Sequence, residues 1–370
     1  MRAIHVCQRD DPATGGAVRV AEEYVKRLGQ FGIDARLLFL YGDRGFFGEQ
    51  LVDRCDYLGL KNSGDILRMP RLLKYLRQQQ PNIVHHHDDM LWPQLLTLKH
   101  AGKQHLSYNK IVHAHGGGTA KPQPLKLVWL YACQRFSVDA VVCITQEAKN
   151  SQQTNVGFAS EILHVISNGV DLQHYVPPSQ DRKHEIRQSL GLPQTASVVG
   201  FVGRLNNVMK GADDFLNMIA ALPPNYWGIV VGDGPDRFSL KHQAQTLGII
   251  DRIVFTGLLN EPVVAYQAMD VFCMTSRHEP FGLTIIEAMA CDLPVIGFRC
   301  PGGSQEILNE ATGVMLDRRD VELMANAVKL ACQREPPWLD RMMAARSLLA
   351  TTYSWDISAA RLADLYRSLI

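Results

Sequence analysis

The sequence has no C-x-x-C pair, no net excess of charge and no long apolar run. Its eight cysteines are scattered, several of them inside apolar segments, which favours buried reduced thiols over disulfides or a zinc site. The net charge of +1 gives no bulk attraction to nucleic acid. No apolar stretch approaches the roughly 18 residues of a membrane helix, and the opening MRAIHVCQRDD does not resemble a signal peptide. We expect a cytoplasmic protein without a nucleic-acid partner.

Short β-branched runs alternate with segments of helical period along the 370 residues. The pattern restarts after residue 195, and interleaved apolar strands and helices indicate parallel sheets covered on both faces. The predicted fold class is therefore α/β, with two Rossmann-like domains whose parallel sheets face across a cleft. The predicted strands are 3–7, 35–40, 83–86, 110–115, 140–144 and 161–166, then 197–202, 227–231, 252–255, 271–274, 294–297 and 313–316; the predicted helices include 17–30, 65–79 and 125–136, then 212–222, 235–247, 283–290 and 320–332.

The domain boundary is predicted within SNGVDLQHYVPPSQDRKHE (167–185). Asn168-Gly169 is a turn signal, and Pro177-Pro178 followed by polar residues is the most linker-like stretch of the chain. Ligands of open α/β sheets bind at the carboxyl ends of the strands. Functional residues are therefore expected just after strands in both halves.

The stretch RHEPFGLTIIEAMA (277–290) places two carboxylates around a turn. Glu279 lies in the turn after a predicted strand, and Glu287 lies just over one turn into the following helix. Between them, the first backbone N–H groups near Gly282, Leu283 and Thr284 lack helical partners, which makes a site for phosphate. Each carboxylate can accept hydrogen bonds from sugar hydroxyls. The stretch therefore fits a sugar diphosphate, whereas a solvated Glu287 and a dipole-stabilising Glu279 would be the structural alternative.

Cations and glycines follow other predicted strands. Arg204 and Lys210 come after strand 197–202, and two cations suit two phosphates. A lysine near the start of a helix is favourable only when an anion is also there. In the first half, Gly15 and Gly16 lie between a strand and a helix, where backbone amides can reach a ligand.

Histidines form two further candidates. KIVHAHGGG ends a strand at His115; His113 lies on the same side and is the alternative. In VHHHDD (84–89), only His85 and His87 share a face, so a metal site is disfavoured. The basic segment 68–80 suits an ordinary covering helix better than a membrane-surface helix.

These motifs, taken together, resemble retaining glycosyltransferases of family 4, which have the GT-B fold and use nucleotide sugars. Glu-x7-Glu around Pro-Phe-Gly is the most specific motif. PATGGAVR, VGRLNNVMKG, GDGPDR, PGGSQEIL and YSWD occur in the family order, so the resemblance covers nearly the whole chain. It implies an N-terminal acceptor-side domain, 1–172 plus 355–370, and a nucleotide-sugar-binding domain, 178–354.

The resemblance also implies roles for individual residues. Glu279 would contact the donor sugar, Glu287 the ribose, and Arg204 and Lys210 the diphosphate, while His115 would reach the sugar from the N-terminal domain. Backbone contacts would come from the Gly15-Gly16 loop and from Phe281, Gly282, Leu283 and Thr284.

The implied function is a retaining, metal-independent hexosyltransferase without a cofactor. It would move a sugar from a UDP- or GDP-sugar to a saccharide or lipid-linked hydroxyl acceptor in cell-surface polysaccharide, lipopolysaccharide or glycolipid synthesis, with possible peripheral contact at the inner membrane face. Nothing in the chain resembles the Asp-x-Asp metal site of the other large glycosyltransferase fold. The alternatives are a GT-B epimerase or phosphorylase, and a catalytically silent nucleotide-sugar-binding subunit. Loops 43–62 and 116–124, which match no motif, would shape the acceptor site.

Overall fold

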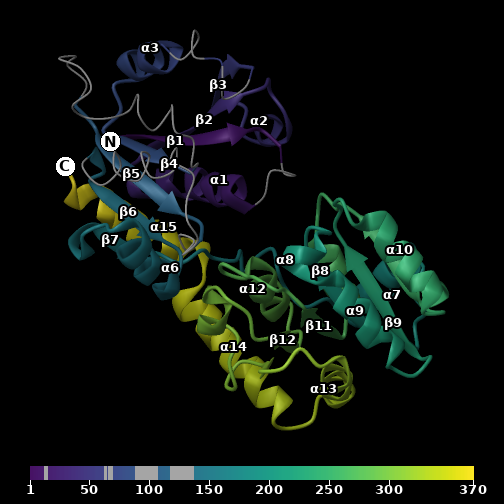
Figure 1. Cartoon of the computed structure of the whole chain (residues 1–370). Helices are drawn as coiled ribbons and strands as arrows, with labels where there is room; N and C mark the ends of the chain where they lie inside the picture. Colours follow the sequence, from purple (N-terminus) through teal and green to yellow (C-terminus); the bar gives the residue numbers. More distant parts are fainter. Residues whose placement is uncertain (12–15, 62–64, 66–69, 88–106, 117–136) are drawn as a thin grey trace. The chain divides into compact units, whose positions relative to one another are not determined.

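The computed structural model describes residues 1–11, 16–61, 65, 70–87, 107–116 and 137–370. The chain divides into two compact units (Figure 1). Unit 1 comprises Met1–Asn168 and Trp355–Ile370, and unit 2 comprises Gly169–Ser354. Each unit is a parallel sheet with helices packed on it, which confirms the predicted α/β class.

Seven parallel strands form the sheet of unit 1, in the order β3-β2-β1-β4-β5-β6-β7. The strand order reverses between β1 and β4, which pair with His5 opposite His85. This reversal is the point where open α/β sheets characteristically bind ligands. The strands are β1 (Arg2–Arg9), β2 (Asp34–Tyr41), β3 (Cys55–Leu60), β4 (Ile83–His86), β5 (Asn109–Ala114), β6 (Ala140–Cys143) and β7 (Leu163–Val165).

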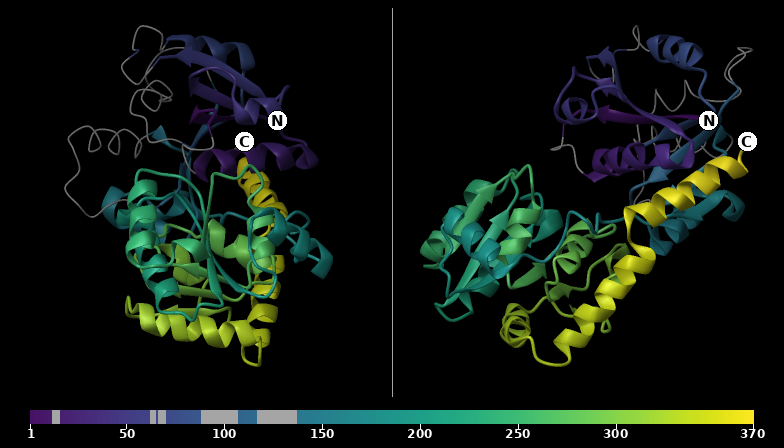
Figure 2. Two further views of the ribbon diagram at one scale, coloured as in Figure 1. Left: turned by 90° about the vertical axis from the view of Figure 1, so that its right-hand side faces the viewer. Right: turned by 180° about the vertical axis from the view of Figure 1, so that it is seen from behind.

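The helices of unit 1 cover its sheet through their apolar faces. The first and last of them, α1 and α15, pack against each other although they come from opposite ends of the chain (Figure 2). Helix α3 buries Leu72 and Leu76 in the core, so its apolar face serves as a covering face, as the preferred interpretation of the basic segment requires. The helices are α1 (Gly16–Leu28), α2 (Phe46–Gln50), α3 (Pro70–Gln79), α6 (Gln146–Ser151) and α15 (Trp355–Ser368).

Unit 2 repeats the architecture with six parallel strands, in the order β10-β9-β8-β11-β12-β13. Here the order reverses between β8 and β11. The strands are β8 (Ser197–Val202), β9 (Tyr226–Val231), β10 (Ile253–Gly257), β11 (Val271–Met274), β12 (Val295–Phe298) and β13 (Val314–Leu316); the helices are α7 (Gln180–Ser189), α8 (Asn207–Lys210), α9 (Ala212–Ala220), α10 (Arg237–Thr246), α11 (Val263–Ala268), α12 (Leu283–Ala290), α13 (Val321–Gln333) and α14 (Trp338–Thr352).

Four elements, in three parts of the chain, differ from the sequence-based expectation. The polar residues after Pro177-Pro178 form α7 rather than a linker, because Ser179 caps the helix by accepting a hydrogen bond from the Arg182 N–H. Segment 43–62, expected to be a loop, contains α2 and β3. The long helix α14 was not predicted; its sequence has no Gly or Pro, but also no clear apolar stripe. The predicted helix 125–136 lies outside the described residues.

Two further findings concern thiols and membrane segments. The seven cysteines in the described part of the chain are free, and five of them are buried, in agreement with the predicted reduced thiols. Within the described ranges, none of the helices combines the length and the hydrophobicity that a membrane span requires.

Candidate donor site

The loops that follow β8 and β9 in unit 2 are joined by backbone hydrogen bonds. They lie beside the point where the strand order reverses. Gly203, directly after β8, donates its N–H to the Val231 carbonyl oxygen at 3.0 Å, and Leu205 donates to Asp233 at 2.9 Å. A Cβ atom on Gly232 would clash with the Gly203 carbonyl oxygen, so glycine is required for this close approach. Arg204 is consequently exposed at the carboxyl end of β8, and no described residue forms an ion pair with its guanidinium.

The loop after β11 is joined to α8. The N–H of Arg277 donates to the Met209 carbonyl oxygen at 2.8 Å. This backbone contact brings Lys210, the last residue of α8, to the turn that contains Glu279. The Lys210 Nζ then lies 2.6 Å from Glu279 Oε2.

Glu279 is buried and held from several sides. Its Oε2 accepts a second hydrogen bond, from the Ser276 hydroxyl at 2.9 Å, and its N–H donates to Pro301 at 3.0 Å. The segment PGGSQEIL packs beneath the turn, where a Cβ on Gly302 would clash with the Glu279 carbonyl oxygen. Glu279 therefore has a fixed position at the carboxyl end of β11.

The start of α12 is open to an anion. Gly282 precedes the helix with φ of 107° and supplies no side-chain cap, so the first N–H groups near Leu283 and Thr284 keep no side-chain partner in the described structure. Phe281 is buried against Tyr353 with ring centroids 5.8 Å apart, which anchors the turn. The predicted turn and helix are confirmed, while their contacts with a ligand stay a prediction.

Glu287 is the fifth residue of α12. It is positioned by a tyrosine that was not predicted from the sequence. The Tyr266 hydroxyl, buried on α11, donates to Glu287 Oε2 at 2.7 Å. Burial, and then the Glu287 charge, raise the pKa of Tyr266 well above its usual value, so it remains a donor. The partly buried Glu287 is thus more than a solvated helix residue.

A network of two arginines and two aspartates, also not predicted from the sequence, holds the loops of this site together. Arg277 pairs with Asp213 at 2.8 Å and with Asp214 at 3.0 Å, both in the first turn of α9. Arg319 pairs with Asp214 and donates to the Ser276 carbonyl oxygen at 3.0 Å. The pair Asp213-Asp214, which follows Lys210-Gly211 after one alanine, was the available sequence signal, but its partners come from two distant loops.

In unit 1, the structure separates the two candidate histidines of β5. His113 is 3% exposed within the sheet layer, whereas His115, just after the strand, is half-buried. Burial lowers the pKa of His115 to about 4. His115 is therefore the more exposed of the two, and its contact with a ligand stays a prediction. Gly16 is the first residue of α1, and Gly15 lies outside the described residues.

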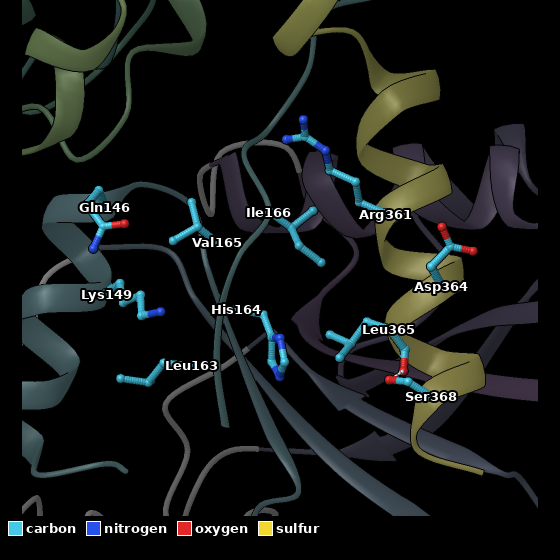
Figure 3. A pocket seen from close by; sticks show the side chains of 10 residues that line it. All are labelled: Gln146, Lys149, Leu163, His164, Val165, Ile166, Arg361, Asp364, Leu365 and Ser368. Atoms are coloured by element: carbon cyan, nitrogen blue, oxygen red, sulfur yellow. Dashed lines mark hydrogen bonds between the residues drawn. The ribbon is translucent and has the colours of Figure 1, made fainter. Parts of the chain in front are cut away.

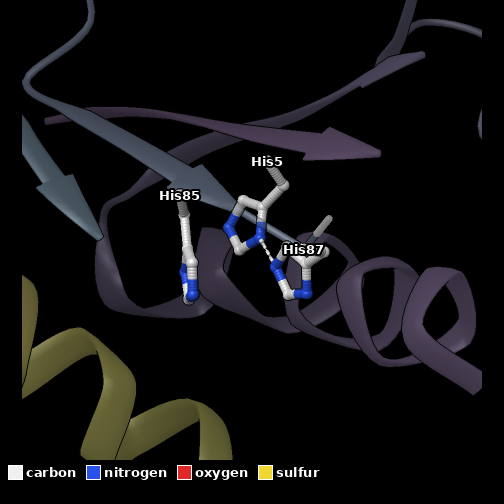
Figure 4. Close-up of side chains that lie close together, drawn as sticks. All are labelled: His5, His85 and His87. Carbon is white, nitrogen blue, oxygen red and sulfur yellow. Dashed lines mark hydrogen bonds between the residues drawn. The ribbon is translucent and has the colours of Figure 1, made fainter. Parts of the chain in front are cut away.

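Histidines from three strands gather at the β1–β4 reversal, which the sequence reading did not foresee. His85 and His87 do share a face, as predicted, but His5 lies beside them (Figure 4). The nitrogens of this group, and those of the group His87, His113 and His115, lie within 4.8 Å of one another. Such spacing is compatible with either hydrogen bonds or a shared ion.

An open groove of about 570 Å³ lies elsewhere on unit 1, among α6, β7 and α15 (Figure 3). Lys149 and Arg361 give it cationic side chains from two elements. None of the predicted site residues lines this groove.

Two family models match the chain, in the order expected. "Glycosyltransferase Family 4" matches residues 14–174, and "Glycosyl transferases group 1" matches residues 182–346. A D-inositol 3-phosphate glycosyltransferase of Corynebacterium urealyticum is 30% identical over 63% of this chain and 56% of its own length. The lipopolysaccharide core biosynthesis mannosyltransferase LpsB of Rhizobium meliloti is 31% identical over 56% of this chain and 61% of its own. The chain thus spans little more than half the length of these curated relatives.

The solved structures agree on the fold. HepE of Anabaena, solved in complex with UDP, matches with a TM-score of 0.84 and 20% identity over 100% of both chains. Sucrose-phosphate synthase of Thermosynechococcus elongatus matches with 0.78 and 21% over 100% of this chain and 99% of that one. With two family models covering most of its length and this fold, the chain belongs to the glycosyltransferases of family 4.

Proposed function

We propose that the protein transfers a sugar from a nucleoside diphosphate sugar to a hydroxyl acceptor, with retention of anomeric configuration and without a divalent metal ion. The observation that carries the proposal is the Lys210–Glu279 ion pair next to the uncapped start of α12. It combines a cation for phosphate, backbone donors for phosphate and a buried carboxylate for hydroxyls at one strand end.

The ion pair suggests how a donor would bind. A diphosphate would bind Lys210, in place of Glu279, and the N–H groups at the start of α12, since both favour anions. Glu279 then loses its cationic partner and offers its oxygens to the sugar hydroxyls. Arg204, already exposed at the end of β8, adds the second cation.

Glu287 suits the nucleoside end of the donor. As the fifth residue of a helix with 1.5 Å rise per residue, it lies about 6–8 Å along α12 from the phosphate donors. Tyr266 holds one of its oxygens, so the carboxylate is already oriented before the ribose hydroxyls bind. A carboxylate that is already oriented loses less conformational freedom when the ribose binds.

The proposed chemistry is substitution on one face of the sugar. The bond from the anomeric carbon to the phosphate oxygen breaks, the acceptor oxygen bonds to the same face, and the acceptor proton passes to the departing phosphate oxygen. Arg204, Lys210 and the α12 N–H groups stabilise the charge on that leaving group. His115 would contact the sugar.

The acceptor class is inferred from relatives. Two of the relatives are named as a D-inositol 3-phosphate glycosyltransferase and a lipopolysaccharide core mannosyltransferase, and structures of the similar protein HepE hold UDP or UDP-glucose. A UDP- or GDP-sugar donor and a saccharide or lipid-linked acceptor in cell-surface glycan synthesis fit these names.

A thermal-shift panel of UDP-, GDP- and ADP-sugars tests the donor, because a ligand bound only by the folded state raises its stability. We expect one nucleotide series to raise the Tm of the wild type but not of Lys210→Met. Lys241→Met is the matched control, since Lys241 lies on the exposed side of α10 over Phe255. Equal shifts in all three proteins would contradict the donor site.

Metal independence has its own test. Turnover of the donor identified above should persist in excess EDTA, because fixed cations stabilise the leaving group. Complete loss of turnover, restored only by magnesium or manganese, would contradict this part of the proposal.

A further inference from the structure

Six buried or half-buried side chains of unit 1 form one continuous hydrogen-bonded chain. They come from β1, the ends of β4 and β5, and helix α15. The consecutive contacts are His113 Nδ1 to His85 Nε2 at 3.2 Å, His85 Nδ1 to Tyr366 Oη at 2.6 Å, Tyr366 Oη to His5 Nε2 at 3.2 Å, His5 Nδ1 to His87 Nε2 at 2.9 Å, and His87 Nδ1 to His115 Nε2 at 3.2 Å.

All five histidines of this hydrogen-bonded chain are neutral at pH 7. Burial lowers the pKa of His5 to about 3 and that of His115 to about 4. Burial and the neighbouring histidines lower the pKa of His85, His87 and His113 well below the usual value. Each ring therefore has one N–H and one lone pair, as a hydrogen-bonded chain needs.

The order of the atoms couples the tautomers. Each His–His contact joins an Nδ1 to an Nε2, and Tyr366 donates to one ring and accepts from another. If one ring carries its proton on Nδ1, the next must do so as well. When Tyr366 donates to one of its two rings and accepts from the other, only two arrangements satisfy all the contacts: all five rings as Nδ1–H, or all five as Nε2–H. A third arrangement, in which Tyr366 accepts from both His85 and His5, would leave its buried hydroxyl proton without an acceptor and is disfavoured for that reason.

The ends of the chain distinguish the two arrangements. His113 Nε2 is buried and has no hydrogen-bond partner in the part of the chain that the structure describes, whereas His115 is half-buried. The all-Nε2–H arrangement would bury an unpaired N–H at His113, and orphaned buried donors are rarer than under-satisfied acceptors. We propose that the chain holds all five histidines as the Nδ1–H tautomer, so that His115 presents Nδ1–H as a hydrogen-bond donor.

The distances favour shared protons over a shared metal ion. Between His5 and His87 the ring centroids are 5.1 Å apart and the nitrogens 2.9 Å, so the two nitrogens point at each other. An ion bound at 2.0–2.1 Å to both would need nitrogens roughly 3.3–4.1 Å apart. The pair His87–His115 has the same edge-to-edge arrangement, with centroids 5.3 Å and nitrogens 3.2 Å apart.

Tyr366, His5 and His87 are then positioning residues that act through His115. A fixed Nδ1–H donates to a sugar hydroxyl or a ring oxygen but cannot accept a proton from the acceptor. This consequence rests on the proposed function, whereas the tautomer assignment does not.

Nitrogen NMR of protein labelled with [15N]histidine tests the tautomers without any substrate. We expect five rings, linked by N–H···N couplings where two histidines meet, with a protonated Nδ1 and a bare Nε2 from pH 7.5 to 5.5. Protonated Nε2 in these rings, mixed tautomers, or a ring that titrates near pH 6.5 would overturn the proposal. Stoichiometric binding of added zinc chloride by these rings would overturn it in favour of a metal site.

Tyr366→Phe removes one hydroxyl in the middle of the chain. We expect averaged nitrogen shifts in His5, His87 and His115. With the donor identified by the thermal-shift panel, we expect the kcat for release of the nucleoside diphosphate to fall about three- to tenfold, the effect of one hydrogen bond, at unchanged KM. Tyr24→Phe is the matched control. The Tyr24 ring also lies against His5 and His113, but its buried hydroxyl has no hydrogen-bond partner in the described structure.

The outcomes separate the two proposals. If Tyr366→Phe and Tyr24→Phe had equal effects on the nitrogen shifts and on kcat, the proposed coupling of the tautomers through Tyr366 would be contradicted. A wild type with the expected tautomers that releases nucleoside diphosphate from none of the UDP-, GDP- or ADP-sugars would support the hydrogen-bonded chain and count against the proposed function.

Discussion

Lys210 and Ser276 both contact one oxygen of Glu279, whereas Glu287 accepts a hydrogen bond from Tyr266. The two carboxylates of the Glu-x7-Glu motif therefore differ in what they lose when a ligand binds. Under the proposed function, Glu279 would exchange a lysine for sugar hydroxyls, while Glu287 would keep its tyrosine and add the ribose. This difference yields separate expectations for the two residues.

We expect Glu287→Ala to weaken binding of free UDP or GDP about tenfold or more, the loss of hydrogen bonds to a charged group. Glu279→Ala should bind the nucleotide at least as well as the wild type, because Lys210 is left unpaired, yet lose turnover. Calorimetric titration measures both affinities, with the exposed Glu310→Ala as control. Similar losses of affinity in the two variants would refute the division of roles.

Gly302 offers a second residue-scale prediction. Its φ is 114° and an added Cβ would clash with the Glu279 carbonyl oxygen, so Gly302→Ala should destabilise the turn and abolish nucleotide binding. Gly248→Ala is the control, since Gly248 has φ of 67° but no atom within 4 Å of an added Cβ. The control measures the cost of a left-handed backbone without a clash, about 1–2 kcal/mol. Gly302, with ψ of 179°, lies in a region that is open almost only to glycine, so its substitution should cost more. Nucleotide binding that survives in both variants would show that the Gly302 contact is dispensable.

At the scale of an element, helix α7 depends on one carboxylate at the start of β11. Asp270 pairs with Lys183 at 2.6 Å and with Arg187 at 2.7 Å, and accepts a hydrogen bond from the Val198 N–H. Burial opposes ionisation, but the two cations outweigh it and lower the pKa of Asp270. This anchor explains why a polar segment without a strong apolar face folds as a helix.

Asp270→Asn should destabilise the packing of α7 by about 2 kcal/mol, the cost of losing partly buried hydrogen bonds between charged groups. Hydrogen exchange of α7 peptides measures this, with Asp364→Asn as control because its pair with Arg367 is exposed. The contribution of the wild-type carboxylate is present above about pH 4 and is lost as the pH falls through its lowered folded-state pKa. Unchanged exchange in Asp270→Asn would refute the anchoring role.

At the scale of the whole molecule, the buried histidines make unit 1 sensitive to acid. Helices α1 and α15 cover the cluster with Tyr24 and Tyr366, and four of its histidines are buried. Their pKa values are lower in the folded state than in the unfolded chain, so the unfolded chain binds more protons below about pH 6.5. Unit 1 therefore carries its full stability only above that pH.

Each such histidine should cost about 1.4 kcal/mol of unfolding free energy per pH unit below 6.5, until its folded-state pKa is reached. Hydrogen exchange of β4 and β5 peptides at pH 8.0, 6.5 and 5.5, corrected for intrinsic rates, measures the change. Peptides of β8 and β9 in unit 2 provide the internal control. A loss of protection equal in both units would contradict the assignment to the histidines.

Much of the fold was predictable because its signals are local. The apolar runs and helical periods fixed the order of strands and helices, and the strand ends placed Arg204, Glu279 and His115 correctly. Two of the missed elements, α7 and β3, have charged contacts with other elements: Asp270 pairs with two residues of α7, and Asp56 of β3 pairs with Arg36 of β2. Periodicity reports which face is apolar, and it cannot report a charge partner on another element.

The sequence by itself determined the family and the two α/β halves, and it supplied the two glutamates as candidate site residues, since these depend on motifs of neighbouring residues. Only the tertiary structure decided which residues orient them. Tyr266 reaches Glu287 from another helix, and Tyr366 reaches His5 from the opposite end of the chain. Such contacts arise when sheets and helices pack, because packing brings together side chains that no sequence interval relates.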